Sequence, residues 1–396
     1  MYSPNPLKMI VKDKQRDLSL VLDAANSNER ITGFTHDFYN YPARFSPLLA
    51  REIISEFTTQ GDLVLDPFMG GGTTLIEAKL QDRLSVGFDI SSLASFLTNV
   101  KLNPISVERI DFFGSWLAEA VAKLNCHRNV EIPNEWISKG YLKNLDNKEI
   151  WPIRKLIEQF LFELETSDAS ETEMNFLRCV LLKTSQWALD SKRVIPSVKL
   201  FKSRLVENYS LMARGTKEYW DTNTKASAIA INLPAEEIHK NQWAFAKRPK
   251  LVLTSPPYPG VHVVYHRWQV FGKKESPAPF WIANSPDGHG LTHYAMGGRA
   301  QKGLKDYFNN IRKSFESIRE VCDDQTVIIQ ILAFSNIDWQ LPKYLETMQA
   351  AGFTESVPLA ERIWRSVPNR KWYAQQKGST QSSKEVILFH RLAEKN

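Results

Sequence analysis

Cysteine is scarce in this sequence. The 396 residues include only three cysteines, which are scattered and form no C-x-x-C pair, so neither a disulfide framework nor a cysteine-based zinc site is indicated. No apolar run reaches the roughly 18 residues of a membrane-spanning helix, and the first residues contain no apolar h-region. We therefore expect a protein of the reducing cytoplasm with no membrane partner.

A strong charge of either sign is also missing. The formal net charge of +6 favours a polyanionic partner but does not identify nucleic acid by itself. We find no internal repeat and no low-complexity tract. With 43% hydrophobic residues, the chain is able to bury the core of one large domain and a substantial insertion.

The first regular pattern is a strand, a turn and a helix. Residues 61–66, "GDLVLD", predict a short buried strand, which is followed by the turn "PFMGGGTT" and the helical stretch "LIEAKLQD". A second buried strand, "LSVGFDI", ends in Asp89. Residues 61–90 therefore predict the opening β-α-β unit of a doubly wound sheet.

The same style returns near the carboxyl end. "RPKLVLTSPPY" contains a strand, and predicted helices at 304–321 and 341–352 alternate with strands at 325–332 and 384–391. Residues 105–247 differ, because long amphipathic helical stretches dominate them. We predict an α/β fold, a doubly wound Rossmann-like sheet with a large helical insertion. The predicted parts are a first core half at 1–104, the insertion at 105–247 and a second core half at 248–396.

The turn "DPFMGGGTT" has the character of a ligand site. Three glycines at the end of a strand allow close approach of a ligand and leave the helix N-terminus open. Thr73 and Thr74 follow where a G-x-G-x-x-G motif would need a further spaced glycine, so a dinucleotide fits poorly. Asp89 is suited to accept two ribose hydroxyls, and Asp66 to accept an ammonium group or a water. S-adenosylmethionine carries these groups; the alternative is a glycine turn needed only for tight packing.

The stretch "KLVLTSPPYPG" at 250–260 ends a strand in a rigid proline turn. The Ser255 hydroxyl and the Pro256 carbonyl are two acceptors able to take both hydrogens of an exocyclic amino group, and so to direct its lone pair at a methyl group. Tyr258 offers a flat face on which a base would stack. The turn therefore favours methyl transfer to the amino group of a base.

Together the two motifs resemble the DNA amino-methyltransferases, the N4-cytosine and N6-adenine family of the SPPY type. The resemblance covers residues 33–100 and 248–391, including "THDFYNYPARFSPLLAREII", which resembles the family's amino-terminal cofactor segment. It implies S-adenosylmethionine as cofactor, DNA with a flipped base as substrate, and cytosine N4 as target because serine leads the motif. The implied catalytic residues are Ser255, Pro256, Pro257 and Tyr258. The implied cofactor-binding residues are Phe45, Asp66, Pro67, Phe68, Gly70, Gly72, Thr73 and Asp89.

The order of the motifs places the insertion where one class of this family carries its target-recognition region. Because the insertion is helical and only modestly basic, a purely structural lobe is an equal alternative. Two stretches that interleave basic and aromatic residues, 260–281 and 362–379, suit phosphate contact and base stacking, although core tryptophans or a solvated hairpin would give the same pattern. The candidate nucleic-acid contacts are His266, Arg267, Arg365, Arg370 and Trp372. No carboxylate or cysteine lies at ligand spacing from the histidines, so we predict no metal.

Three functions remain in view. Methylation of a ring carbon is excluded, because it needs a thiolate and no cysteine here follows a proline. A DNA amino-methyltransferase is the first hypothesis, with restriction or defence-system proteins as partners implied by the resemblance. An RNA amino-methyltransferase of the tRNA guanine-N2 type and a non-catalytic nucleic-acid-binding protein of the same fold are the alternatives. The recognition sequence and the oligomeric state stay open.

Overall fold

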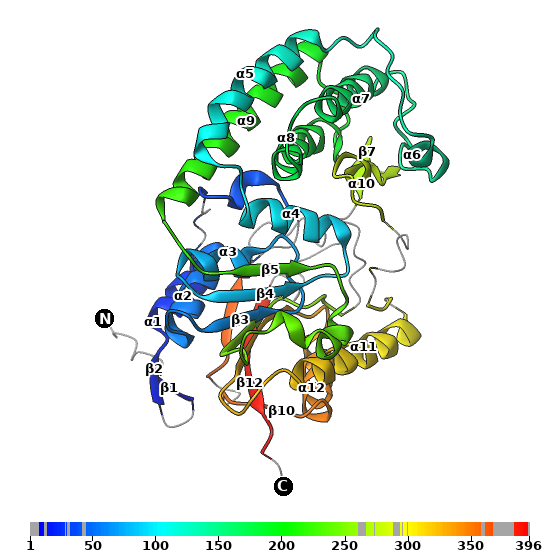
Figure 1. The fold of residues 1–396 in the computed structure, drawn as a ribbon. Helices are drawn as coiled ribbons and strands as arrows, with labels where there is room; N and C mark the ends of the chain where they lie inside the picture. Colours follow the sequence, from blue (N-terminus) through cyan, green and yellow to red (C-terminus); the bar gives the residue numbers. More distant parts are fainter. Residues whose placement is uncertain are drawn as a thin grey trace, which may run out of the picture.

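The computed structural model describes residues 8–11, 14–27, 29, 32–41, 45–259, 267–272, 274–287, 294, 296–298, 300–357, 361–366 and 384–394. Figure 1 shows a twisted sheet with helices packed on it in the lower part of the molecule, and a lobe of helices above. Across the residues described, no helix combines the length and the apolar character needed to cross a bilayer.

The central sheet has the order β10-β12-β9-β6-β3-β4-β5, with β11 paired to β12. Its parallel part contains β3 (Leu63–Asp66), β4 (Leu84–Phe88), β5 (Ala228–Ile231), β6 (Leu251–Thr254) and β9 (Val327–Ala333). The antiparallel part contains β10 (Phe353–Glu355), β11 (Ile363–Ser366) and β12 (Lys384–Leu392). The predicted strands at both ends of the chain are thus confirmed, and they form one sheet.

Helices cover both faces of this sheet. Successive residues of a strand point to opposite faces, so neighbouring residues pack against different helices. Val64, Leu253 and Ile329 pack with α1 (Ser19–Asn26) and α2 (Pro47–Phe57). Leu65 and Val252 face the other way and pack with α11 (Gln301–Arg319) and α12 (Ile337–Ala350). The predicted doubly wound α/β fold is therefore confirmed.

The helical lobe is built from α5 (Val107–Lys123), α6 (Asn134–Ser138), α7 (Trp151–Glu165), α8 (Glu171–Leu189) and α9 (Val198–Asp221). Its apolar core continues into α4 (Ser92–Leu102), β7 (Trp268–Val270) and α10 (Ala278–Ile282). After α9 the chain returns to the sheet as β5, which pairs with β4, before the predicted insertion end at residue 247. The lobe therefore shares its core with segments from both predicted core halves.

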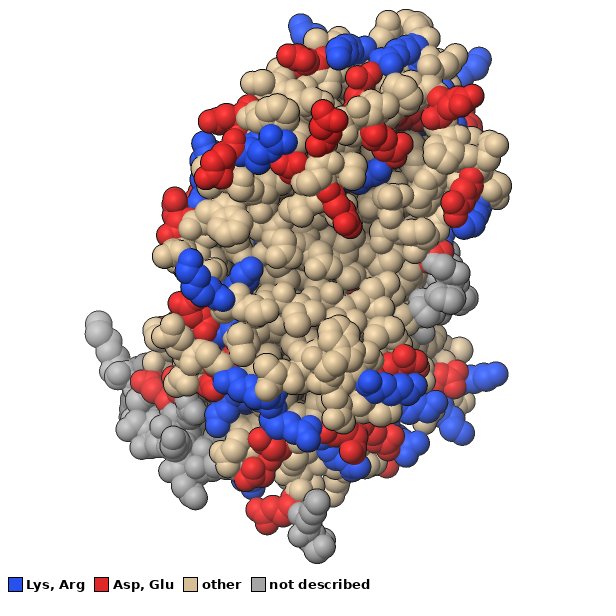
Figure 2. All heavy atoms as spheres, viewed as in Figure 1, with Lys and Arg blue, Asp and Glu red and all other residues tan. Residues whose placement is uncertain are grey.

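Shorter elements complete the described chain. They are β1 (Lys8–Val11), β2 (Lys14–Asp17), β8 (Lys274–Ser276) and the 3₁₀ turns η1 (His36–Phe38), η2 (Ala235–Lys240) and η3 (Gln242–Ala244). On the face of the molecule seen in Figure 2, basic and acidic residues are intermixed near the top and the bottom, and the middle is largely uncharged. This face therefore offers no continuous basic surface.

The glycine turn joins β3 to α3 (Thr73–Leu80) and passes very close to α4. Gly72 has φ +78°, and a Cβ added there would lie 2.7 Å from Thr98 Cγ2. Gly61, just before β3, has nearly the same φ of +79°, but no atom lies within 4 Å of an added Cβ. The two positions therefore separate backbone strain from steric contact.

We predict that Gly72→Ala destabilises the protein more than Gly61→Ala. Alanine at a left-handed position costs about 1–2 kcal/mol at either site, and the contact with Thr98 adds about 1–3 kcal/mol at Gly72 alone. Urea unfolding of both variants would measure the two losses. Equal losses would contradict the inferred tight fit between the glycine turn and α4.

Candidate active site

The glycine turn and the proline turn meet at the carboxyl edge of the sheet. They follow β3 and β6, which are parallel neighbours. The Asp66 carboxylate at the end of β3 accepts hydrogen bonds from the Thr254 hydroxyl at 2.7 Å and from the Thr74 hydroxyl at 2.6 Å. The Phe68 amide donates to the same carboxylate at 3.1 Å. One side chain thus joins the end of β6 to the glycine turn and the start of α3.

Asp66 is 1% exposed, and burial raises its pKa to about 6 against the opposing effect of the hydrogen bonds from Thr74 and Thr254. Both of its oxygens already accept hydrogen bonds within the protein. The observed geometry gives Asp66 a structural task, and the ammonium contact expected from the sequence stays a prediction.

Asp89 lies beside the glycine turn, just beyond the end of β4. Its carboxylate accepts the Gly70 amide at 2.9 Å and the Ser91 amide at 2.8 Å. Burial raises the pKa of Asp89 to about 6, and the two amide hydrogen bonds oppose this rise. The residue is partly exposed, and each carboxylate oxygen has a second acceptor site. Asp89 therefore remains able to accept hydroxyl groups from a ligand.

The other predicted cofactor residues occupy different surroundings. Phe68 is half-buried and packs, like Tyr258, against the apolar cluster on the α11 side of the sheet. Phe45 packs against the cluster on the α2 side, so these contacts do not bring it to Phe68. Pro67 and Thr73 are buried. Contact of these four residues with a cofactor stays a prediction.

The proline turn is fixed by partners that lie far away in the sequence. The Ser255 hydroxyl donates to the Ile331 carbonyl at 3.0 Å. The Tyr307 hydroxyl, from the buried side of α11, donates to the Pro257 carbonyl at 2.8 Å. In the described structure no donor is placed on the Pro256 carbonyl. These contacts hold the turn and leave the Pro256 carbonyl as an acceptor.

Tyr258 is fixed by an acid on the last strand. Its hydroxyl donates to Glu385 at 2.7 Å and lies 3.4 Å from the Ser255 hydroxyl oxygen. Arg365 pairs with the second oxygen of Glu385 at 3.2 Å. The described structure therefore brings Ser255, Tyr258 and Arg365 together around one buried carboxylate.

The commitment of the Ser255 proton has a chemical consequence. A serine hydroxyl has one hydrogen and two lone pairs. With that hydrogen given to the Ile331 carbonyl, the oxygen presents lone pairs to any further partner. An incoming amino group would meet an acceptor at Ser255 and a second acceptor at the Pro256 carbonyl.

The five predicted nucleic-acid contacts stay predictions. Arg267 is paired with the nearly buried Asp287 at 2.5 Å, and Arg365 with Glu385, so each arginine already neutralises an acid. A contact with phosphate would have to share or break these pairs. His266, Arg370 and Trp372 lie outside the described residues.

Four supporting residues escaped the sequence analysis as parts of this site: Thr74, Thr254, Tyr307 and Glu385. Glu385 had a detectable signal, because it occupies the register of Ile387 and Phe389 on the last strand, where an apolar residue is expected. Tyr307 had none, since its contact joins two distant segments. In the part of the chain described, no group of three His, Cys, Asp or Glu residues is arranged to hold a metal.

The sequence comparisons with known proteins each cover only part of the chain. Residues 8–95 match the family model described as DNA methylase, N6_N4_Mtase. The Type II methyltransferase M.MjaII of Methanocaldococcus jannaschii is 32% identical over 94 residues, 24% of this chain and 18% of that protein. The Type II methyltransferase M.BsoBI of Geobacillus stearothermophilus is 42% identical over 72 residues, 18% of this chain and 13% of that protein. The matched stretches thus span less than a fifth of these relatives.

Among solved structures, the rRNA methyltransferase aviRa from Streptomyces viridochromogenes superposes on 95% of this chain and 94% of its own, with 10% identity and a TM-score of 0.37. The family match contains the glycine turn and Asp89 and ends before the proline turn. The segment at residues 8–95 is therefore similar to the N6_N4_Mtase DNA methylases.

Proposed function

We propose that this protein is an S-adenosylmethionine-dependent DNA methyltransferase that modifies an exocyclic amino group. We assign cytosine N4 as the target because serine leads the catalytic motif. The observation that carries this proposal is the fixed proton of Ser255, which leaves the hydroxyl oxygen as an acceptor next to the Pro256 carbonyl. The similarity of residues 8–95 to DNA methylases supports the same reading.

The glycine turn fits the cofactor by its chemistry. Asp89 is partly exposed and retains acceptor sites for two ribose hydroxyls, while its amide partners hold it in place. When bound, S-adenosylmethionine supplies a methyl group made electrophilic by its sulfonium. Asp66 sets the glycine turn next to β6, the strand that Ser255 follows, so the ligands of the two turns would meet at one edge.

The protein's contribution to the reaction is the orientation of the amino nitrogen. Ser255 accepts one amino hydrogen and the Pro256 carbonyl accepts the other, so the nitrogen becomes tetrahedral and its lone pair points to the methyl group. The bound cofactor would supply the methyl group and leave as S-adenosylhomocysteine, and the surplus proton of the methylated amino group would be released to solvent. Tyr258 would hold the base by stacking, with its ring oriented by Glu385.

The direct test is to incubate the purified protein with S-adenosylmethionine and mixed-sequence DNA, and in parallel with RNA, and to analyse the nucleosides by mass spectrometry. N4-methylcytosine in DNA is the expected product. N6-methyladenine would keep the chemistry and overturn the cytosine assignment. A methylated base in RNA alone would overturn the DNA substrate, and no methylated base in either would overturn the proposal.

We predict that Ser255→Ala lowers kcat by about 10²-fold, the usual loss for one group that stabilises a transition state, and leaves DNA binding unchanged. The matched control is Ser356→Ala, because Ser356 also donates to a strand carbonyl, that of Phe389, at 3.1 Å. Methylation rates and DNA binding would be measured for both variants. Full activity in Ser255→Ala would exclude the assigned role.

Tyr258 allows stacking to be separated from orientation. We expect Tyr258→Ala to weaken base binding by about 1–3 kcal/mol, the typical contribution of aromatic stacking. Tyr258→Phe keeps the ring and removes the hydroxyl, which donates to Glu385 and lies 3.4 Å from the Ser255 hydroxyl oxygen, so its loss of base binding should be smaller. The measurement is the KM for a short DNA duplex. Equal losses in the two variants would mean that the ring itself does not stack.

The raised pKa of Asp89 leads us to predict that cofactor binding depends on pH. The ionised carboxylate accepts ribose hydroxyls, and its pKa in the free protein is raised to about 6 by burial. Below that pH the cofactor must displace a proton, so its Kd should rise by up to about tenfold per pH unit and stay flat above neutral pH. Calorimetry between pH 5 and 8 would measure this. Asp89→Asn should bind weakly and lose most of the dependence, although Asp66 still titrates; an unchanged dependence would contradict the assignment.

A further inference from the structure

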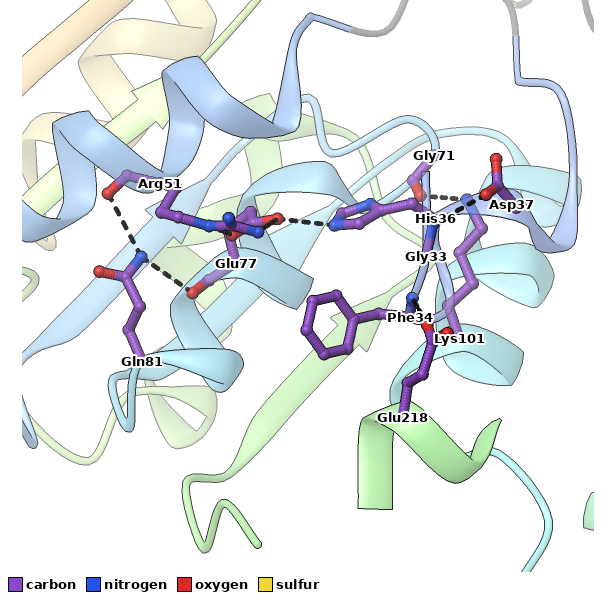
Figure 3. Close-up of polar contacts among 10 residues, drawn as sticks. All are labelled: Gly33, Phe34, His36, Asp37, Arg51, Gly71, Glu77, Gln81, Lys101 and Glu218. Atoms are coloured by element: carbon purple, nitrogen blue, oxygen red, sulfur yellow. Dashed lines mark hydrogen bonds and ion pairs between the residues drawn. The ribbon is translucent and has the colours of Figure 1, made fainter. Parts of the chain in front are cut away.

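Residues 33–41, which we call the bridging segment, lie between the helical lobe and the glycine turn. Figure 3 shows this region, with the His36 ring directed to Glu77 of α3 and the Phe34 backbone amide bonded to Glu218 of α9. The segment contains η1 and pairs with no strand of the described sheet. Its conformation therefore depends on side chains from other elements.

On one side, the bridging segment supports the glycine turn. A Cβ added to Gly71 would lie 2.9 Å from Tyr41 Cβ, so the Tyr41 side chain lies directly against the turn. His36 Nε2 lies 2.7 Å from the buried Glu77 carboxylate, which Arg51 also contacts at 2.9 Å. The segment is thus attached both to the turn and to the helix that follows it.

On the other side, side chains of α8 bind its backbone carbonyls. Lys183 donates to the Asp37 carbonyl, and Gln186 donates to the Asn40 carbonyl at 3.0 Å. Cys179, one turn earlier, directs its thiol at the Phe38 carbonyl at 3.7 Å. These spacings of four and three residues place the donors on one face of α8.

Helix α9 holds the start of the bridging segment. The Glu218 carboxylate accepts the Phe34 amide at 2.8 Å, and Phe34 has the left-handed φ of +45°. Gly215 permits this approach, because a Cβ there would come within 2.0 Å of the Phe34 carbonyl oxygen. A non-glycine residue at positive φ is uncommon and persists where surrounding contacts determine it.

Side chains of the lobe therefore form hydrogen bonds with backbone groups of the bridging segment, which has no strand partner in the described sheet. Unpaired polar backbone groups are costly to bury, so without these helices the segment would adopt another path and Tyr41 would leave the glycine turn. Lys101 of α4, a helix in the same apolar core as α8, adds a hydrogen bond to the Gly71 carbonyl at 2.8 Å.

We propose that the helical lobe positions the cofactor turn, with Lys183, Gln186 and Glu218 acting through the bridging segment as positioning residues. The identity of the cofactor rests on the proposed function, whereas the mechanical link rests on the contacts above. The lobe then contributes to cofactor binding whether or not it also contacts DNA.

The test compares Lys183→Met and Glu218→Ala with matched controls in the same lobe. Lys202 likewise donates to a backbone carbonyl, that of Leu124 at 2.8 Å, and Glu207 lies on the same helix as Glu218 and pairs with Arg204. Lys202→Met and Glu207→Ala therefore remove similar groups without touching the bridging segment. Thermal unfolding of all four variants would show whether stability changes differ between test and control.

Two readouts are needed. Calorimetry with S-adenosylhomocysteine should show affinity about tenfold lower in Lys183→Met and Glu218→Ala, the loss expected for a hydrogen bond to a charged group, and unchanged affinity in the controls. Hydrogen exchange of amides 69–72 in the free protein should be faster in the two test variants alone. Lys183→Arg, which keeps a donor, should restore both values, and kcat at saturating cofactor should remain near that of the wild type.

The outcomes separate the two proposals. Equal affinity and equal exchange in test and control variants would overturn the positioning role. Faster exchange in the test variants, together with a wild-type protein that does not bind S-adenosylhomocysteine, would overturn the cofactor assignment and retain the mechanical link. If Lys183→Met does not fold, Gln186→Ala gives the same comparison, because its partly exposed amide makes a single hydrogen bond.

Discussion

The buried carboxylate of Asp66 is the constraint on which the arrangement of both turns depends. It receives a hydroxyl from α3, a hydroxyl from β6 and an amide from the glycine turn. A carboxylate suits this task because it accepts several hydrogen bonds and donates none when ionised. Burial opposes ionisation and raises its pKa to about 6, so the three donors are needed to keep the charge inside. Thr254 precedes Ser255 directly, and the position of the acceptor hydroxyl thus follows from that of Asp66.

The proline turn depends on a second carboxylate with a different role. Glu385 comes from β12, the antiparallel strand that lies between β9 and β10, and it fixes the Tyr258 hydroxyl while Arg365 balances its charge. Tyr307 of α11 also fixes the turn, because its hydroxyl donates to the Pro257 carbonyl. The two prolines restrict the backbone of the turn, and contacts from β9, β12 and α11 add to its rigidity. In the proposed reaction this rigidity would matter, because an acceptor that moved freely would lose its directing effect on an amino group.

The sequence predicts the core strands well, since parallel strands buried on both faces appear as continuous apolar runs, as in residues 63–65 and 251–253. It does not predict β5, because this edge strand is only partly buried and its sequence, AIAI, alternates isoleucine with alanine, which has little preference for strands. The contact of Thr254 with Asp66 also escapes, because strand register between distant segments leaves no local pattern. Arg267 illustrates the same limit: its charge was visible, whereas its partner Asp287 becomes apparent only in the folded chain.

The helical lobe is connected through α8 to segments next to both turns. Helix α8 contacts the bridging segment along one face, and just beyond its end Asp190 accepts the Gln269 amide at 2.9 Å while the Ser191 amide donates to the Gln269 carbonyl at 2.8 Å. Gln269 lies in β7, next to Trp268, whose indole donates to the Tyr39 hydroxyl at 3.2 Å. The bridging segment beside the glycine turn and the strand that follows the proline turn are thus joined to each other and to the same helix. A change in α8 would consequently be able to reach both turns through these hydrogen-bonded contacts.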